Sequence, residues 1–521
     1  MKRTTISLLA TATALAAVTG VAALTAPDGG AATEAKAPPR LPVERSSLLC
    51  PAPSSSEVAE TAYTSFTPAG TAGEDAKDGT AELKPSSAVL SDPDTAPKKD
   101  DESKADAAKG DAAKGAKKPA SGKPVLALKE PGKPVAATAE GGDAPALVGT
   151  ATGRLAPGWT TQQTTTVTAG GSRGLLGLSC TGPDTDFWFP GASTAEDRQD
   201  YVHLTNPDDT AAVADIELYG KDGALKTTLT EGIPVPAGSS VPVLLSTLTA
   251  AEPAADVTVH VTTRTGRVGA VVRAADDKAG SDWLTASADP SGTAVLPGIP
   301  ADATSVRLVA FAPGDDDADL KVQLAGATGR ITPAGHETLH VKSGMTASVD
   351  LLDVTKGEAG SLILSPSQSG RATPVVAALR VVRGKGDKQE VAYIPATAPV
   401  GGRATAADNR AKGSTLSLTA PGATAQVKVT ASAGTLGGTQ VVKTYTVKAG
   451  TTLAVTPPVP AGLKGSYALT VETESGGPVH ASRTLALAQN GISMFTVQTL
   501  PDDRGTVAVP EAEQDLSVLD D

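Results

Sequence analysis

Aromatic side chains are scarce in this chain of 521 residues, which has five Phe, six Tyr and three Trp. With only two cysteines, the chain cannot be a small fold held together by many disulfides. Acidic residues outnumber basic ones, and the net charge of −12 argues against a nucleic-acid partner. Beyond the N-terminal segment, no apolar run is long enough to span a bilayer, which excludes a membrane protein with many spanning helices.

Glycine, proline, valine, threonine and alanine are abundant instead, and they favour short strands joined by turns. Apolar and polar residues alternate in several segments, such as residues 256–263, 425–430 and 467–472, as in strands with one buried face. Turn-forming residues interrupt these segments every 8–12 positions. The pattern predicts an all-β protein built from sandwiches of the immunoglobulin or fibronectin kind.

The N-terminus predicts export. Lys2 and Arg3 precede an uncharged, Ala-rich stretch over residues 6–24, and small residues and Pro27 follow it, as in a secretory signal peptide over residues 1–26. The stretch also suits an uncleaved signal-anchor, so an N-terminal membrane anchor is the alternative. Cys50 lacks the small preceding residue of a lipoprotein site. We expect a secreted or cell-envelope protein.

Cys50 and Cys180 are the two cysteines. In an oxidising compartment such a pair is expected to form a disulfide, and two free thiols or a catalytic cysteine are the alternative. Neither cysteine has a histidine near it in the sequence.

Three landmarks recur in the same order along the chain. The segment at residues 235–243 is matched at 341–349 and 447–455, so that each copy begins 106 residues after the previous one. Proline turns precede the copies and glycine turns follow them. The repetition predicts three tandem sandwich units. Their predicted bounds are residues 41–67 plus 144–290, residues 291–398, and residues 401–500.

Two segments contain few large apolar side chains. Residues 68–143 combine Ala, Gly and Pro with charges of both signs, so we expect a disordered insertion within the first unit. Residues 501–521 form an acidic tail that we expect to be frayed.

Three motifs match catalytic or metal-binding patterns. Residues 336–340 fit H-E-x-x-H, but they precede the repeated β signature, and on a strand two histidines at this spacing lie too far apart to share one metal ion. Residues 170–174 fit G-x-S-x-G without the strand–helix alternation that this motif needs. The acidic run at residues 315–319 reads as a solvated turn. We therefore predict no cofactor, no metal and no enzymatic activity.

Most of the aromatic residues lie in the first predicted unit and its lead-in. Alternation places Phe187 and Phe189 on one face of a strand and Trp188 on the other. One set is expected in the core, and the other is a candidate binding surface together with Trp159 and Trp283. A purely structural role for all five is the alternative.

Residues 45–51, 156–159, 180–191 and 206–207 resemble an uncharacterised family of exported actinobacterial proteins, known only as a domain of unknown function. The resemblance implies an exported or envelope-associated protein. It implies no activity, substrate or catalytic residue.

These observations favour a non-catalytic cell-envelope scaffold or binding protein. The expected partner is an envelope protein or a surface glycan, and nucleic acid is excluded. The alternative is a secreted hydrolase, or an accessory subunit of a cell-wall or membrane glycan-assembly complex.

Overall fold

The computed structural model describes residues 38–70, 72–73, 76–88, 122–229, 231–368, 372–489 and 491–510. Its regular elements are β-strands and three short 3-10 helices, η1 (Gly153–Leu155), η2 (Leu245–Thr247) and η3 (Gly386–Lys388). The predicted all-β class is confirmed. Residues 42–506 form one compact unit. In the other unit, the structure describes residues 38–41 and 507–510. These residues include most of β1 (Arg40–Pro42) and β39 (Thr506–Ala508), which pair as a two-stranded sheet.

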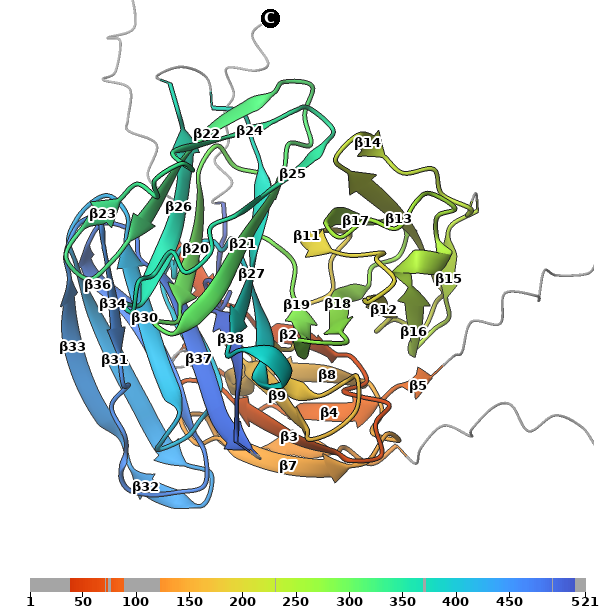
Figure 1. Ribbon diagram of the computed structural model, residues 1–521. Helices are drawn as coiled ribbons and strands as arrows, with labels where there is room; N and C mark the ends of the chain where they lie inside the picture. Colours follow the sequence, from red (N-terminus) through yellow and green to blue (C-terminus); the bar gives the residue numbers. More distant parts are fainter. Residues whose placement is uncertain are drawn as a thin grey trace, which may run out of the picture. The chain divides into compact units, whose positions relative to one another are not determined.

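The described residues between 42 and 506 form four sandwiches of mainly antiparallel sheets, coloured along the chain in Figure 1. Sandwich 1 consists of β2 (Arg45–Cys50), β3 (Ala59–Phe66), β4 (Ala81–Pro85), β6 (Leu126–Leu128), β7 (Val135–Glu140), β8 (Leu147–Thr152), β9 (Thr160–Val167) and β10 (Gly174–Ser179). Sandwich 2 consists of β11 (Asp186–Ala192), β12 (Tyr201–Thr205), β13 (Ala212–Gly220), β14 (Gly223–Ala224), β15 (Ile233–Val235), β16 (Ser239–Leu244), β17 (Val257–Thr265), β18 (Gly269–Asp276) and β19 (Gly280–Leu284), with β5 (Ser87–Ala88) added in parallel to β16.

The two C-terminal sandwiches follow the same plan. Sandwich 3 consists of β20 (Ala294–Ile299), β21 (Ala303–Phe311), β22 (Ala318–Ala325), β23 (Arg330–Ile331), β24 (Thr338–Val341), β25 (Thr346–Asp350), β26 (Gly360–Pro366), β27 (Val376–Arg383) and β28 (Glu390–Pro395). Sandwich 4 consists of β29 (Ala404–Asn409), β30 (Ser414–Ala420), β31 (Ala425–Gly434), β32 (Gly437–Thr439), β33 (Val441–Val447), β34 (Thr451–Val455), β35 (Ala461–Lys464), β36 (Tyr467–Gly476), β37 (His480–Gln489) and β38 (Ile492–Thr499).

All four sandwiches have one strand order. When the eight principal strands of each are numbered along the chain, one sheet has the order 1-6-3-4 and the other has the order 5-2-7-8. In sandwich 3, for example, the two sheets are β20-β26-β22-β24 and β25-β21-β27-β28. The four sandwiches are therefore copies of one topology.

Alternation decides which side chains fill the space between the two sheets. In β17, Val257, Val259 and Val261 are fully buried in the core, while His260 between them faces outward. Each sandwich has its own apolar cluster, to which both of its sheets contribute. Burial of these side chains provides the main driving force for folding of each sandwich.

The structure differs from the predicted units at the N-terminus. The second and third predicted units correspond to sandwiches 3 and 4, but the first contains two sandwiches. Within the predicted insertion, β4 and β6 bury Ala81, Leu83, Leu126 and Leu128 in the core of sandwich 1. These few apolar residues are spaced two apart, which suffices for a strand although the surrounding composition suggests disorder. Residues 89–121 of the predicted insertion lie outside the described residues.

The repeated segment is the turn between the fourth and fifth strands. A buried valine ends the fourth strand in three copies, and three residues later a glycine has a left-handed φ: Val235 and Gly238 (+57°), Val341 and Gly344 (+65°), Val447 and Gly450 (+71°). In sandwich 1 the same place is taken by Leu128 and Gly132 (φ +81°), one residue further apart. Glycine adopts this backbone conformation without the steric cost that a side chain would add.

The sandwiches contact one another through equivalent strands. The eighth strands form a closed cycle of contacts, in which β10 packs against β19, β19 against β28, β28 against β38, and β38 against β10. The first strand of one sandwich also packs against the seventh strand of another, as β11 does on β27, β20 on β37, and β29 on β9. The fourth sandwich therefore meets the first.

Hydrogen bonds cross these interfaces between sandwiches, which we call seams. Asp282 of sandwich 2 is fully buried and accepts hydrogen bonds from the Gly177 N–H of sandwich 1 (3.0 Å) and the Thr496 hydroxyl of sandwich 4 (3.2 Å). Burial raises the pKa of this carboxyl well above its usual value. Other seams have Thr164 Oγ1 donating to Asp408 Oδ2 (2.8 Å), Arg198 Nη2 donating to Tyr393 OH (2.9 Å), and Ser361 Oγ 2.7 Å from Thr419 Oγ1.

Candidate functional site

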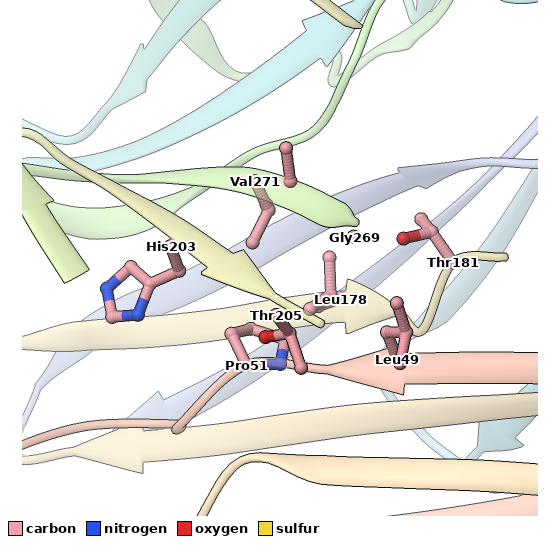
Figure 2. A pocket seen from close by; sticks show the side chains of 9 residues that line it. Leu49, Pro51, Leu178, Thr181, His203, Thr205, Gly269 and Val271 are labelled. Carbon is pink, nitrogen blue, oxygen red and sulfur yellow. The ribbon is translucent and has the colours of Figure 1, made fainter. Parts of the chain in front are cut away.

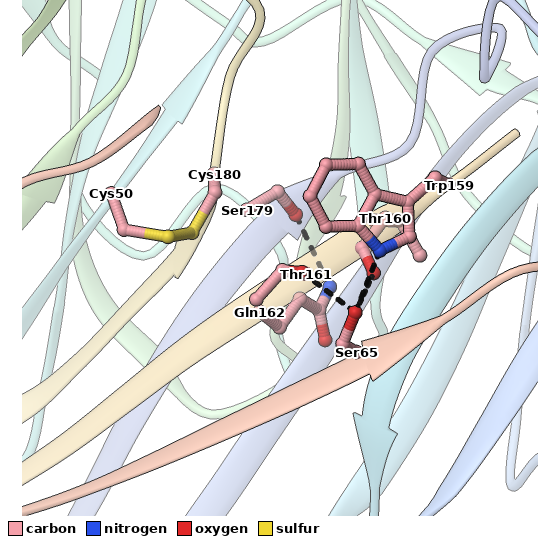
Figure 3. Close-up of a disulfide and its surroundings, with 8 residues drawn as sticks. All are labelled: Cys50, Ser65, Trp159, Thr160, Thr161, Gln162, Ser179 and Cys180. Carbon is pink, nitrogen blue, oxygen red and sulfur yellow. Dashed lines mark hydrogen bonds between the residues drawn. A yellow bond between two sulfur atoms is a disulfide. The ribbon is translucent and has the colours of Figure 1, made fainter. Parts of the chain in front are cut away.

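The structure separates the five aromatic residues that the sequence offers as a candidate surface or as core, and it buries four of them. Trp159 lies in the core of sandwich 1, where its indole N–H donates to Ser65 Oγ at 2.8 Å (Figure 3). Phe187 and Phe189 face the core of sandwich 2, and Trp283 is buried where sandwiches 1 and 2 meet. These four side chains form no exposed surface, because a chain with few large apolar residues uses them to fill its interior.

The predicted disulfide between Cys50 and Cys180 is confirmed (Figure 3). It joins the end of β2 to the residue that follows β10, with 4.7 Å between the Cα atoms. Both cysteines are buried in the core of sandwich 1. The bond therefore ties together the first and last strands of this sandwich and has a structural role.

The three pattern matches lie in turns and strands. His340 is part of β24, as expected, and its ring nitrogens lie 2.8 Å from an Asp319 oxygen and 3.5 Å from an Asp317 oxygen. Residues 170–174 include the turn between β9 and β10. Within the described ranges, no three His, Cys, Asp or Glu side chains are placed to hold one metal ion.

Trp188 belongs to a cluster on the outer face of sandwich 2. The adjacent strands β11, β17 and β13 place Trp188 beside His260, and His260 beside Glu217. The Trp188 and His260 rings stack with centroids 3.6 Å apart and an angle of 7°. Alternation adds Asp186 and Tyr219 to the same face. We call these five residues the acidic patch.

The polar groups of the acidic patch are connected through His260. Its Nε2 lies 3.1 Å from Asp186 Oδ1, and its Nδ1 lies 3.3 Å from Glu217 Oε2. The Tyr219 hydroxyl also donates to Glu217 Oε2, at 2.9 Å. The two carboxylate side chains are 58% and 56% exposed, whereas that of His260 is only 13% exposed. The patch thus presents negative charge to solvent above a base of aromatic rings.

Part of this aromatic base comes from sandwich 3. The Phe311 ring lies 5.4 Å from the Trp188 ring and 4.7 Å from the Tyr219 ring, measured between centroids. Thr346 of sandwich 3 donates to the Tyr219 carbonyl at 2.7 Å. Burial, with the nearby Glu217 carboxylate, raises the pKa of Tyr219 to about 12. Contacts between two sandwiches therefore hold the patch in place.

Charge is distributed unevenly among the sandwiches. Residues 184–290, which include sandwich 2, contain 17 acidic and seven basic side chains. Residues 401–500, which include sandwich 4, contain three acidic and eight basic side chains. The acidic patch therefore lies in the most acidic part of the described structure, where a cationic partner would be attracted.

A small cavity lies where sandwiches 1 and 2 meet (Figure 2). Leu49, Leu178, His203 and Val271 are among the residues that line it. Its volume of about 10 Å³ is at the lower limit for one water molecule. Burial, with the nearby Arg273, lowers the pKa of His203 to about 3, so this imidazole is neutral. The cavity is too small for an organic ligand.

Comparison with known proteins assigns the family. A family of unknown function (DUF5719) matches residues 135–458, which is more than half of the chain. The chain belongs to this family. The match runs from the first residue of β7 to just beyond β34 and so covers at least part of every sandwich. No curated protein and no solved structure matches the chain.

The predicted resemblance to a family without known activity is confirmed. The exported and actinobacterial character of the protein stays a prediction. Within the ranges that the structure describes, no helix has the length and apolar character needed to cross a membrane. The predicted signal peptide at residues 1–26 lies outside those ranges.

Proposed function

We propose that the protein is an exported, non-catalytic scaffold that binds a partner at the cell envelope through the acidic patch of sandwich 2. The observation that carries this proposal is the pair of exposed carboxylates, Asp186 and Glu217, on either side of His260. Together with the Trp188 and Tyr219 rings, they suit the ammonium or guanidinium group of a basic partner protein.

The seams between the sandwiches support a scaffold. Arg307 of sandwich 3 pairs with Asp256 of sandwich 2 at 2.6 Å, and Arg380 of sandwich 3 pairs with Asp276 of sandwich 2 at the same distance. Such contacts favour one fixed arrangement of the sandwiches, and rigid surfaces bind partners with little loss of conformational entropy.

His260 supports binding rather than catalysis. A general base needs a ring nitrogen within reach of the substrate proton. Both nitrogens of His260 already face carboxylates, and its ring stacks on Trp188. The imidazole therefore serves to orient these carboxylates: it donates to one of them when the ring is neutral and to both when the ring is protonated.

The N-terminal sequence and the Cys50–Cys180 disulfide support export, because disulfides persist mainly outside the cytoplasm.

One observation favours a secreted glycoside hydrolase as a second candidate. Asp186 and Glu217 are two exposed carboxylates on one face, and most enzymes of that class act through such a pair.

A binding titration tests the proposal. Fluorescently labelled octalysine would be titrated into the full chain and into a variant with Asp186→Asn and Glu217→Gln. We expect at least tenfold weaker binding by the variant. A control with Asp315→Asn and Asp316→Asn removes equal charge from a turn of sandwich 3 and should bind almost as tightly as the unaltered chain.

Two results would count against the proposal. Equal weakening in both variants would show that octalysine responds only to net charge. Release of sugars from cell-wall glycan by the unaltered chain, and not by the Asp186 and Glu217 variant, would support the hydrolase instead.

A further inference from the structure

The edge of sandwich 4 carries an unpaired strand. β33 ends the sheet β29-β36-β31-β33 and pairs with β31 over seven residues (Figure 1). In the part of the chain that the structure describes, no strand pairs with its other side. Alternate residues of β33 therefore turn backbone N–H and C=O groups toward an open side.

The same strand is short in the other copies of the fold. Its equivalents β6, β15 and β24 have three, three and four residues, and β15 also contains Pro234, which has no N–H to donate. Short edge strands and prolines protect a sheet from pairing with other chains. Along β33, sandwich 4 has neither of these two forms of protection. A lysine on an edge strand is a third form, and Lys443 would deter a basic strand but not an acidic one.

Apolar side chains are exposed at one end of this edge. Val442 on β33 is 50% exposed, and Leu436, at the turn before β32, is 78% exposed. The Leu436 N–H donates to the Lys464 carbonyl at 3.1 Å, so the end of β35 lies beside this turn. Exposed apolar side chains beside an open strand edge are typical of a surface that pairs with another chain.

The charge of this edge is positive. Lys443 lies on β33 with its ammonium 4.7 Å from the centre of the Tyr445 ring, and Lys448 directly follows the strand. Within the described residues, neither of these two lysines forms a salt bridge. A chain with a net charge of −12 thus has a basic edge here, which suits an acidic partner.

We propose that β33 binds an extended acidic segment of a partner polypeptide as an additional antiparallel strand. Main-chain hydrogen bonds to β33 would hold the segment, its apolar residues would cover Val442, and its carboxylates would face Lys443 and Lys448. This site is separate from the acidic patch and does not depend on it.

A peptide titration with the full chain tests this proposal. The probe is a synthetic seven-residue peptide of alternating valine and threonine with glutamate at each end. A second peptide has lysine in place of glutamate, and a third is the glutamate peptide with N-methyl groups on alternate residues. We expect the glutamate peptide to bind at least tenfold more tightly than either of the others. The lysine peptide would be repelled by the basic edge, and N-methylation removes the donors that strand addition requires.

Protein variants and amide exchange locate the site. Lys443→Glu and Lys448→Glu together should weaken binding of the glutamate peptide at least tenfold. The control Lys226→Glu and Lys321→Glu changes the net charge equally on sandwiches 2 and 3 and should change binding less than twofold. Amide hydrogens of residues 441–447 should exchange more slowly when the glutamate peptide is bound.

Three outcomes would overturn the proposal. The first is no binding of the glutamate peptide, or equal binding of its N-methylated form. The second is equal weakening by the two sets of lysine substitutions. The third is a dimer in sedimentation experiments whose formation protects residues 441–447, which would assign the edge to a second copy of this chain.

Discussion

Arg173 of sandwich 1 reaches across to sandwich 3 and donates from its Nε to Glu390 Oε1 at 3.0 Å. Its Nη2 donates to the Gln389 carbonyl at 2.6 Å. The Glu390 side chain is only 1% exposed, so its charge depends on this guanidinium for compensation. The pair joins two sandwiches that are not consecutive in the chain.

Arg173→Met should therefore destabilise the protein by roughly 3 kcal/mol at pH 8, because it leaves a buried carboxylate without its partner. The free energy of unfolding in denaturant, with circular dichroism as the signal, measures this loss. Adding Glu390→Gln should restore part of it. If the double variant were no more stable than Arg173→Met alone, the ion pair would not be the cause.

The buried Asp200 and Glu390 carboxyls should lower the stability as the pH rises from 5.5 to 8, whereas His203, with its pKa lowered to about 3, should raise it over the lower part of this range. Burial raises the pKa of Asp200 to about 6 and that of Glu390 to about 7, despite the opposing effects of Arg198 and Arg173. These values exceed the usual ones near 4, so the folded protein holds protons that the unfolded chain releases. The stabilisation is complete below about pH 4 and is lost as the pH rises through 6 and 7.

Glu390→Gln tests the origin of this pH dependence. The amide cannot ionise, so the loss of unfolding free energy between pH 5.5 and 8 should shrink by roughly 1–3 kcal/mol. Midpoints of thermal unfolding at several pH values measure it. An unchanged slope in the variant would assign the effect to other groups.

Loss of the disulfide should weaken sandwich 1. Cys50 and Cys180 are 130 residues apart, and the bond restricts the unfolded chain over that whole length. Replacing both with alanine should lower the free energy of unfolding by about 2–5 kcal/mol. Mass spectrometry of the native protein before and after reduction shows whether the bond is present. Equal stability of the oxidised protein and the variant would contradict a structural role.

Glycine should be required at position 344 because of the backbone conformation there, and not because a side chain would lack space. Its φ is +65°, and an added Cβ would have no heavy atom within 4 Å. Gly344→Ala should therefore cost roughly 1 kcal/mol, from backbone strain without any clash. Gly314→Ala is the matched control, since that site is equally open and its φ is not left-handed. Similar costs at both positions would argue against strain.

Sequence periodicity was sufficient to predict that the fold is all-β and that it is built from repeated units. Alternation identified β17 and β36, and the segment that recurs every 106 residues marked equivalent positions in three sandwiches, which the structure shows to be one turn. Sandwich 1 was missed because an Ala-, Lys- and Gly-rich segment separates β4 from β6. The signal that could have found it is Leu128 with Gly132, which repeats the turn with one extra residue.

The sequence by itself determined the all-β class, the turn that recurs in three of the sandwiches and the pairing of the two cysteines. The class and the turn follow from local periodicity, and each of the two cysteines has only one possible partner within the chain. Tertiary structure decided which aromatic residues face the interior. Alternation shows which residues share a face of a strand, but it does not show which of the two faces is buried. It also brought Asp282 to Gly177 and Thr496, and Arg173 to Glu390. Such partners lie more than 100 residues apart and meet only when whole sandwiches pack together.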